Sequence, residues 1–299
     1  MPSTRDIRRR IKSVKSTAQI TKAMQMVASS KMQKAQQSAL NYRPFATMTS
    51  EIMGHLAAYT GDYRHPLMEP HEQVRKHLVI VVSTDKGLCG ALNSNLFREA
   101  SKYDTSTTQF VAVGKKAAQF LARTRRKLVA EFTYHDIPKY AEFAAIAKFV
   151  REAFLKHEVD AVDVIYTRFI NTLSQRPDKR ALLPMGSVES LRSEARTDAQ
   201  AKAPAETPGA EPERIDFIFE PDPATVMDRL ILYFLDFRIA QVLLEAKASE
   251  HSARMVAMKN ATDNANQLVK QLTLEYNKMR QASITKELLE ISSAAMALG

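Results

Sequence analysis

The densest group of chemically capable residues is Asp85-Lys86-Gly87-Leu88-Cys89-Gly90, which follows the apolar run HLVIVVS at residues 77–83. A turn at the carboxyl end of a buried strand is a common place for nucleotide phosphates in α/β domains. This turn lacks G-x-G-x-x-G spacing, and the chain contains no G-x-x-x-x-G-K-[ST]. A phosphate cradle is therefore not supported, and a tight glycine turn is favoured.

Cys89 could act as a nucleophile only if a base activated its thiol. The seven histidines are scattered along the chain, so a packed, inert thiol is the favoured interpretation. There is no H-E-x-x-H, no paired-carboxylate motif and no metal-ligand spacing, and a single cysteine excludes a disulfide framework or a four-cysteine zinc site. We expect no catalytic residue, no metal and no cofactor on this chain.

Charge is concentrated at the start of the chain, which has a net charge of +10. Residues 1–43 hold ten Lys and Arg but a single acid, Asp6, whereas the rest of the chain is nearly balanced. One interpretation is a solvated basic helix face. The other is a surface that meets an acidic partner, either nucleic acid or an acidic protein loop.

The same N-terminal segment has no Gly or Pro between Ser3 and Arg43, which predicts a helix of about 40 residues. Its apolar, small and a few polar residues recur in alternating steps of four and three. This 3.5-residue repeat is typical of a coiled-coil seam. The seam comprises Ile7, Ile11, Val14, Ala18, Thr21, Gln25, Ala28, Met32 and Ala35.

A longer uninterrupted segment runs from Ala224 to Leu298, after Pro221 and Pro223. As one helix it would reach roughly 110 Å at 1.5 Å per residue. Its repeat has three polar interruptions, and we expect His251 to be a packed residue of it rather than a metal ligand. The predicted seam is Leu230, Phe234, Phe237, Gln241, Leu244, Ala248, His251, Met255, Met258, Thr262, Ala265, Val269, Leu272, Tyr276 and Met279.

The simplest assembly pairs these two helices as an antiparallel coiled coil with the middle of the chain folded at its base. If residues 44 and 224 lie near the base, Met1 reaches only to about residue 270, and the last ~30 residues project alone. They are apolar, with Ile284, Leu288, Leu289, Ile291, Met296 and Leu298. Such an end is costly in water, so we expect it to sit inside a partner; folding back or self-association is the alternative.

The middle of the chain alternates predicted strands and helices, which is typical of a doubly wound α/β domain with a mostly parallel sheet. Strands are expected at 77–83, 109–113, 127–132, 161–170 and 180–187, the last after a turn near Pro177, with a final strand at 214–219. Helices are expected at 91–102, 115–125 and 139–157. The Ala- and Pro-rich stretch at about 191–214 is interpreted as a flexible linker.

The composition supports a folded protein, because 45% of the residues are apolar and 25% are charged. No apolar run approaches the ~20 residues of a membrane-spanning helix. The basic start MPSTRDIRRR is not followed by a secretory apolar core. We expect a soluble intracellular protein.

Three stretches resemble the gamma subunit of bacterial F-type ATP synthases, and the resemblance covers essentially the whole chain. They are IRRRIKSVKSTAQITKAMQMVASSKM at 7–32, DKGLCGALNSN at 85–95, and EHSARMVAMKNATDNANQLVKQLTLEYNKMRQASITKELLEI at 250–291. The resemblance implies a long coiled coil with a Rossmann-like foot domain. It implies domain limits of 1–58 for the N-terminal helix, 75–220 for the foot and 221–299 for the C-terminal helix.

The resemblance further implies a non-catalytic central rotor stalk that carries torque from the membrane c-ring to the catalytic alpha/beta hexamer, coupling proton flow to ATP synthesis or hydrolysis. The implied partners are the alpha, beta and epsilon subunits and the c-subunit ring. No nucleic acid and no membrane insertion are expected. The implied location is peripheral, on the cytoplasmic face of the bacterial inner membrane.

Carried over by position, the resemblance implies contacts of five residues with the beta subunits, although ordinary shaft surface is the alternative for each: Met24, Arg254, Gln281, Thr285 and Glu287. It also implies a basic collar facing acidic beta loops, made by Arg8, Arg9, Arg10, Lys12 and Lys22. Two rival functions remain testable. A nucleic-acid binder would show salt-dependent binding through the basic helix, and a stand-alone enzyme would bind nucleotide.

Overall fold

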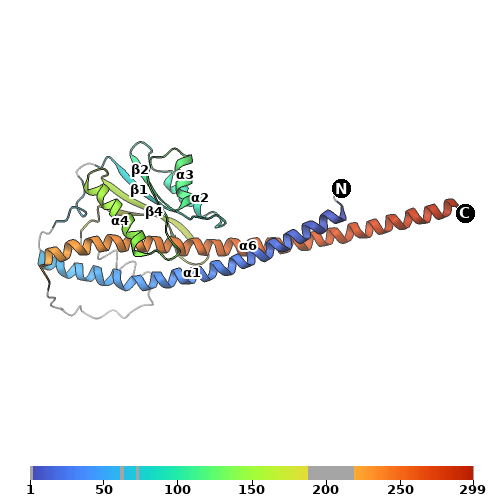
Figure 1. Ribbon diagram of the computed structural model, residues 1–299, viewed down its shortest axis with the longest axis horizontal. Coiled ribbons are helices and arrows are strands. Elements are labelled where there is room, and N and C mark those ends of the chain that lie inside the picture. Colours follow the sequence, from blue (N-terminus) through green and yellow to red (C-terminus); the bar gives the residue numbers. More distant parts are fainter. Residues whose placement is uncertain (1–2, 61–63, 72–73, 188–218, 299) are drawn as a thin grey trace. The chain divides into compact units, whose positions relative to one another are not determined.

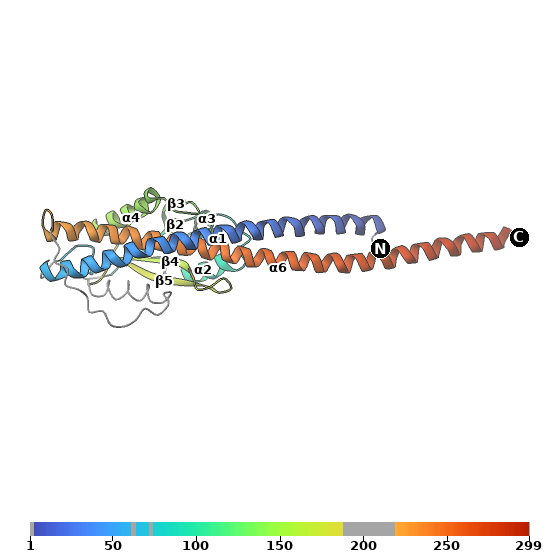
Figure 2. The ribbon, with the colours of Figure 1, turned by 90° about the horizontal axis from the view of Figure 1, so that it is seen from below.

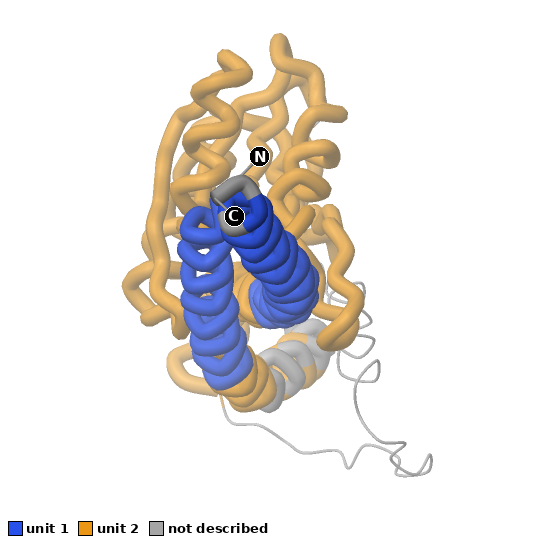
Figure 3. Tube along the Cα trace, turned by 90° about the vertical axis from the view of Figure 1, so that its right-hand side faces the viewer, with its two compact units in different colours: residues 1–30, 254–299 blue, residues 31–253 orange. Residues whose placement is uncertain are grey.

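A computed structural model describes residues 3–60, 64–71, 74–187 and 219–298. The chain divides into two compact units, which Figure 3 shows in different colours. Unit 1 contains residues 1–30 and 254–299, and unit 2 contains residues 31–253. Two long helices belong to both units: α1 spans Thr4–Thr60 and α6 spans Pro223–Leu298.

Unit 2 is built on a five-stranded sheet with the order β3-β2-β1-β4-β5. All neighbouring strands are parallel except β4 and β5, which are antiparallel. The strands are β1 His77–Val82, β2 Thr108–Val113, β3 Leu128–Phe132, β4 Ala161–Phe169 and β5 Gln175–Leu183. The predicted doubly wound, mostly parallel sheet is confirmed.

Helices cover both faces of this sheet (Figure 1). The helices α2 (Leu92–Ala100) and α3 (Lys115–Arg123) pack on one face, against Val79 and Val81 of β1. The opposite residues of β1, Leu78, Ile80 and Val82, pack in a larger core with α4 (Tyr140–Leu155) and the unit 2 parts of α1 and α6. Because side chains alternate along a strand, an apolar run such as HLVIVV must be covered on both faces.

The helix α1 continues past Pro44 to Thr60, so the length of about 40 residues predicted from the segment without Gly and Pro is too short. A proline inside a helix removes one backbone hydrogen bond and costs about 3 kcal/mol. The residues beyond it offset this cost, because Met53 and Leu56 are almost fully buried in the unit 2 core.

The β4–β5 hairpin also differs from expectation. The turn lies at residues 170–174, not near Pro177, and β5 begins at Gln175 rather than near Arg180. Pro177 pairs with Thr167 inside β5. A strand at the edge of a sheet can hold a proline, because one side of its backbone needs no ladder partner.

The predicted linker at about 191–214 and most of the predicted strand at 214–219 lie outside the described residues. The domain limits 1–58, 75–220 and 221–299 stay a prediction, since they divide the chain by sequence rather than by compactness.

The predicted seams agree with the burial of both long helices. Every seam position named above, from Ile7 to Ala35 in α1 and from Leu230 to Met279 in α6, is buried or half-buried. In unit 1 the two helices run side by side (Figure 2). The 3.5-residue repeat therefore locates the face that each helix turns inward.

Candidate partner-binding surface of unit 1

The paired helices of unit 1 approach closely through small seam residues. Ala18, Ala28 and Ala265 are at least nine-tenths buried. Between them the hydroxyl oxygens of Thr21 and Thr262 lie 2.7 Å apart in a buried hydrogen bond. Nearer the start of α1, Arg8 contacts Tyr276, which lies nearer the end of α6 than Thr262, so the pairing is antiparallel.

The pairing ends near the start of α1. The Arg8 guanidinium donates a hydrogen bond to the Tyr276 hydroxyl and lies 5.3 Å from the centre of its ring. Contact therefore reaches a few residues beyond the predicted limit of about residue 270. Ser3 and Asp6 cap the start of α1. The Asp6 N–H donates to Ser3 Oγ at 3.2 Å, and Ser3 Oγ donates in turn to Asp6 Oδ2 at 2.7 Å. The Ser3 hydroxyl and the Ser3 N–H both donate to Asp6 Oδ2 and, aided by the charge of Arg9, hold the pKa of Asp6 below its ordinary value.

Beyond Met279 the α6 helix is exposed on all sides as far as its side chains are described. Every described side chain from Arg280 to Ala294 is exposed. The apolar ones include Leu288 at 62%, Leu289 at 65% and Ile291 at 67%, and Met296 follows at 82%. Isolated exposed apolar residues are ordinary, but a run of them along one helix end marks a surface for a partner.

The five predicted beta-contact residues lie in unit 1 in two different settings. Gln281, Thr285 and Glu287 are exposed on the projecting end of α6. The hydroxyl of Thr285 donates to the Gln281 carbonyl at 2.9 Å, and Glu287 accepts a hydrogen bond from Ser283 at 3.2 Å, so both make contacts within the helix. Met24 and Arg254 are half-buried instead.

All five collar residues, Arg8, Arg9, Arg10, Lys12 and Lys22, are exposed on α1. Two of them also make contacts within unit 1, because Arg8 contacts Tyr276 of α6 and Arg9 forms a 3.1 Å ion pair with Asp6 of α1. An exposed ion pair contributes little stability, so this charge remains accessible to an acidic partner.

Sequence reasoning missed an apolar stripe on α1. Ile20 and Val27 are 57% and 56% exposed, and the half-buried Met24 lies between them at helical spacing. The signal was available, because these residues stand one position before the seam residues Thr21 and Ala28. Together they form an apolar ridge beside the seam, and this ridge stays partly exposed among the described residues of unit 1.

The turn at 85–90 has a structural task in unit 2. Two of the first N–H groups of α3 donate to side chains outside the helix. Lys115 N donates to Asp85 Oδ1 at 3.0 Å, and Ala117 N donates to Ser83 Oγ at 2.7 Å. A carboxylate therefore occupies the helix N-terminus where an anion could bind. Cys89 is buried and its sulfur accepts from Asn93 at 3.5 Å, which agrees with a packed thiol.

Within the described residues, no group of His, Cys, Asp and Glu is arranged to hold a metal ion. The helices of the described chain include none with the length and apolarity needed to cross a bilayer. Two long helices paired through a narrow seam, together with an α/β domain, define the class of the protein: a helical stalk with a sheet domain.

Comparison with known proteins identifies the family. Residues 3–298 match the family described as ATP synthase. The chain is 46% identical over 297 residues to the ATP synthase gamma chain of Opitutus terrae, covering 99% of both chains. It is 45% identical over 304 residues to that of Methylacidiphilum infernorum, covering 100% of both. The chain belongs to the ATP synthase gamma chain family.

Solved structures agree in fold. A chain of the central stalk and c-ring of the Tetrahymena thermophila mitochondrial ATP synthase matches with a TM-score of 0.59 and 26% identity, covering 81% of this chain and 99% of that one. A chain of the Euglena gracilis mitochondrial enzyme in rotational state 3 matches with a TM-score of 0.65 and 20% identity, covering 99% and 94%. The second likeness supports the fold alone.

Proposed function

We propose that this chain is the central rotor stalk of an F-type ATP synthase. It transmits torque from the membrane c-ring to the catalytic alpha/beta hexamer and so couples proton flow to ATP synthesis or hydrolysis. The observation that carries the proposal is the exposed apolar end of α6, in a chain that matches gamma chains over its full length.

The exposed end of α6 is suited to a socket made by other subunits. Leu288, Leu289 and Ile291 gain from burial against partner surface, at about 25 cal/mol per Å² of apolar area. Many weak apolar contacts along a stiff helix allow the helix to turn inside such a socket. Specific ion pairs or interlocking side chains would instead resist turning.

The mechanism requires no chemistry from this chain. A shaft that changes the affinity of a site on another subunit by tenfold must deliver about 1.4 kcal/mol. Contacts made by the predicted residues Met24, Arg254, Gln281, Thr285 and Glu287 with the beta subunits would deliver it. The ridge Ile20–Met24–Val27 widens the contact area that Met24 offers.

The remaining partners follow from the same proposal. The collar on α1 would face acidic loops of the beta subunits, and the sheet domain would meet the epsilon subunit and the c-ring. The chain is a non-catalytic, peripheral member of the membrane complex. Its place would be the cytoplasmic face of the bacterial inner membrane.

Truncation after Gln281 tests the proposal in the assembled ATP synthase. We expect ATP-driven proton pumping to fall strongly while unit 2 melts at the wild-type temperature, because the removed residues make no core contact in unit 2. The measurements are proton uptake by membrane vesicles and thermal melting of the purified chain. Full pumping, or a collapse of the melting transition, would contradict the proposal.

A matched pair of variants separates apolar contact from helix length. Leu288→Asn with Leu289→Asn and Ile291→Asn keeps the length but removes the apolar surface, and should reduce pumping. The control, Lys286→Gln with Glu290→Gln, removes an exposed 3.6 Å ion pair on the same helix and should leave pumping unchanged.

A further inference from the structure

A polar segment of α6 is buried in unit 2 where an apolar helix face would be expected. It comprises Lys247, Ser249, Glu250, His251 and Ser252, which we call the polar anchor. All five residues are at most 4% exposed. Buried polar groups are costly unless they are paired, so these side chains need a reason to be there.

One side of the polar anchor is fixed to the β4–β5 hairpin. The Ser249 hydroxyl donates to the Thr167 carbonyl at 2.8 Å, and the Ser252 hydroxyl donates to the Thr172 carbonyl at 2.8 Å. The Gln175 side chain adds a hydrogen bond to Ser252 at 3.2 Å. The hairpin and α6 are thus joined by directional bonds.

The other side is fixed to the loop 133–139 between β3 and α4. Asp136 in this loop lies 3.2 Å from His251 Nε2 and 4.0 Å from Lys247 Nζ. Lys247 also pairs with Glu250 at 3.2 Å and lies 4.3 Å from the ring centre of the buried Tyr134.

The same carboxylate reaches α1. Lys31 Nζ, from that helix, donates to Asp136 Oδ2 at 2.7 Å. Burial opposes ionisation of Asp136, but the Lys31 hydrogen bond and the charges of His251, Lys31 and Lys247 outweigh it and hold its pKa below the ordinary value. Asp136 is therefore a charged group shared by both long helices.

The loop that carries Asp136 is itself held in place by Glu142 of α4. The Glu142 carboxylate accepts the N–H of Lys139 at 2.9 Å and that of His135 at 3.3 Å, and it contacts the His135 ring. Asp136 is thus presented to the helices from a fixed backbone.

We propose that Asp136 is a positioning residue that clamps α1 and α6 to the sheet domain and fixes the rotation of each helix about its own axis. Apolar packing is non-directional and lets a helix turn within its groove, whereas hydrogen bonds hold donor and acceptor in one orientation. The inference rests on the proposed function, because a rotor that receives torque through its sheet domain must pass it to these two helices.

The contacts of Asp136 contribute unequally to stability. The Lys31 pair is half-exposed on both sides and contributes little by itself. Lys247 and His251 have side chains only 4% and 3% exposed, so losing the carboxylate leaves buried charge and polarity less compensated. We therefore expect a larger effect from Asp136 than from Lys31.

The test compares Asp136→Asn with wild type in the assembled ATP synthase. Hydrogen exchange at residues 133–139 and 247–252 reports the clamp, with α2 and α3 as internal reference. We expect exchange about tenfold faster there, which corresponds to about 1.4 kcal/mol of local opening free energy. Proton pumping per ATP hydrolysed should fall, and Asp136→Glu should restore part of both.

Asp104→Asn is the matched control, because Asp104 is an exposed carboxylate of the same unit whose hydrogen bonds with Ser106 close a local turn. It should leave both readouts unchanged. If hydrogen exchange in Asp136→Asn is unchanged, Asp136 does not clamp the helices. If exchange is faster but pumping is full, the clamp exists but has no part in transmitting torque. Wild-type assemblies that hydrolyse ATP without pumping would instead contradict the proposed function.

Discussion

The α6 helix carries two different kinds of surface along one continuous length. From Met227 to Ser252, in unit 2, almost every side chain is buried or half-buried, with Asp228, Arg229 and Tyr233 exposed. Among the described side chains from Lys259 to Met296, in unit 1, only Thr262, Ala265 and Leu272 are buried. One part of the helix is a core element of a domain, and the other is a rod whose single stripe needs a partner helix.

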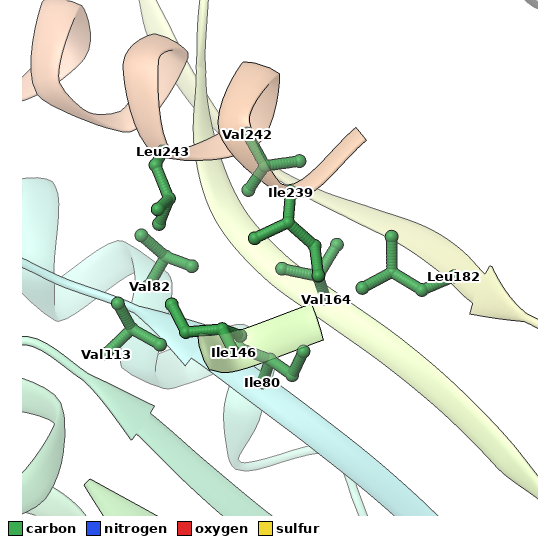
Figure 4. A pocket seen from close by; sticks show the side chains of 9 residues that line it. All are labelled: Ile80, Val82, Val113, Ile146, Val164, Leu182, Ile239, Val242 and Leu243. Carbon is green, nitrogen blue, oxygen red and sulfur yellow. The ribbon is translucent and has the colours of Figure 1, made fainter. Parts of the chain in front are cut away.

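The difference has an energetic meaning. Unit 2 stabilises its helices by apolar contact on several sides, as in the small cavity where Leu243 faces Ile80, Val82 and Ile146 (Figure 4). Unit 1 has a narrow seam with small and polar residues, so much of its surface stays available for other subunits. Unit 2 therefore contributes most of the stabilising apolar contact, whereas unit 1 provides the surface that stays accessible to partners.

The largest expected effect comes from equal truncations in the two regions. Leu243→Ala should destabilise unit 2 by about 2–5 kcal/mol, because removing its side chain enlarges the small cavity that it lines. Leu272→Ala in unit 1 should cost less, since its side chain, though only 5% exposed, packs between two helices alone. Thermal melting and hydrogen exchange of the two variants measure the difference. Equal losses would remove the contrast between the units.

A medium effect is expected from the buried hydroxyl pair of unit 1. Thr21→Val or Thr262→Val alone leaves one hydroxyl facing a methyl group and should cost about 1 kcal/mol. The double variant should cost less than the sum, because the hydrogen bond between the two hydroxyls can be lost only once. In either single variant the remaining hydroxyl still has a backbone carbonyl of its own helix as acceptor. A double-mutant cycle from urea unfolding, with hydrogen exchange of residues 10–30 as the local readout, tests this. Additive losses would show that the two hydroxyls do not interact.

Much of unit 1 could be predicted from the sequence. A 3.5-residue repeat over many turns fixes which face of a helix is buried, and even the polar seam residues Thr21, Gln25 and Thr262 obey it. The α/β order of unit 2 was equally visible, because short apolar runs alternate with amphipathic segments.

The errors and omissions have a common physical cause. The path of α1 through Pro44, the position of Pro177 within β5 and the burial of the polar anchor all depend on tertiary partners. A local pattern records the cost of a proline or a buried lysine but not the distant contact that offsets it. Asp136 carries no local signal, since its partners are Lys31, Lys247 and His251.

The smallest effect compares two carboxylates whose pKa values are lowered, one in each unit. Burial opposes ionisation of Asp160 in unit 2, but hydrogen bonds from the N–H groups of Lys76 and Arg75, each 2.9 Å long, and from His71 outweigh it and lower its pKa from 3.8. The pKa of Asp6 in unit 1 is also lowered, by hydrogen bonds from Ser3, but this carboxylate is exposed to solvent. The Asp160 carboxylate joins the residues before β1 to those before β4, whereas Asp6 serves one helix end.

A lowered folded pKa gives stability that is present above the unfolded value and lost as the pH falls toward the folded one. Asp160→Asn should therefore be less stable than wild type at pH 7, and the gap should narrow below about pH 3.8. Asp6→Asn should show a much smaller gap at every pH, because water screens an exposed charge. Urea unfolding at several pH values measures both variants. A gap for Asp160→Asn that is independent of pH would mean that the charge contributes nothing and that the loss comes from poorer hydrogen bonding by the amide. The two units would then not differ in how they use the charge of a carboxylate.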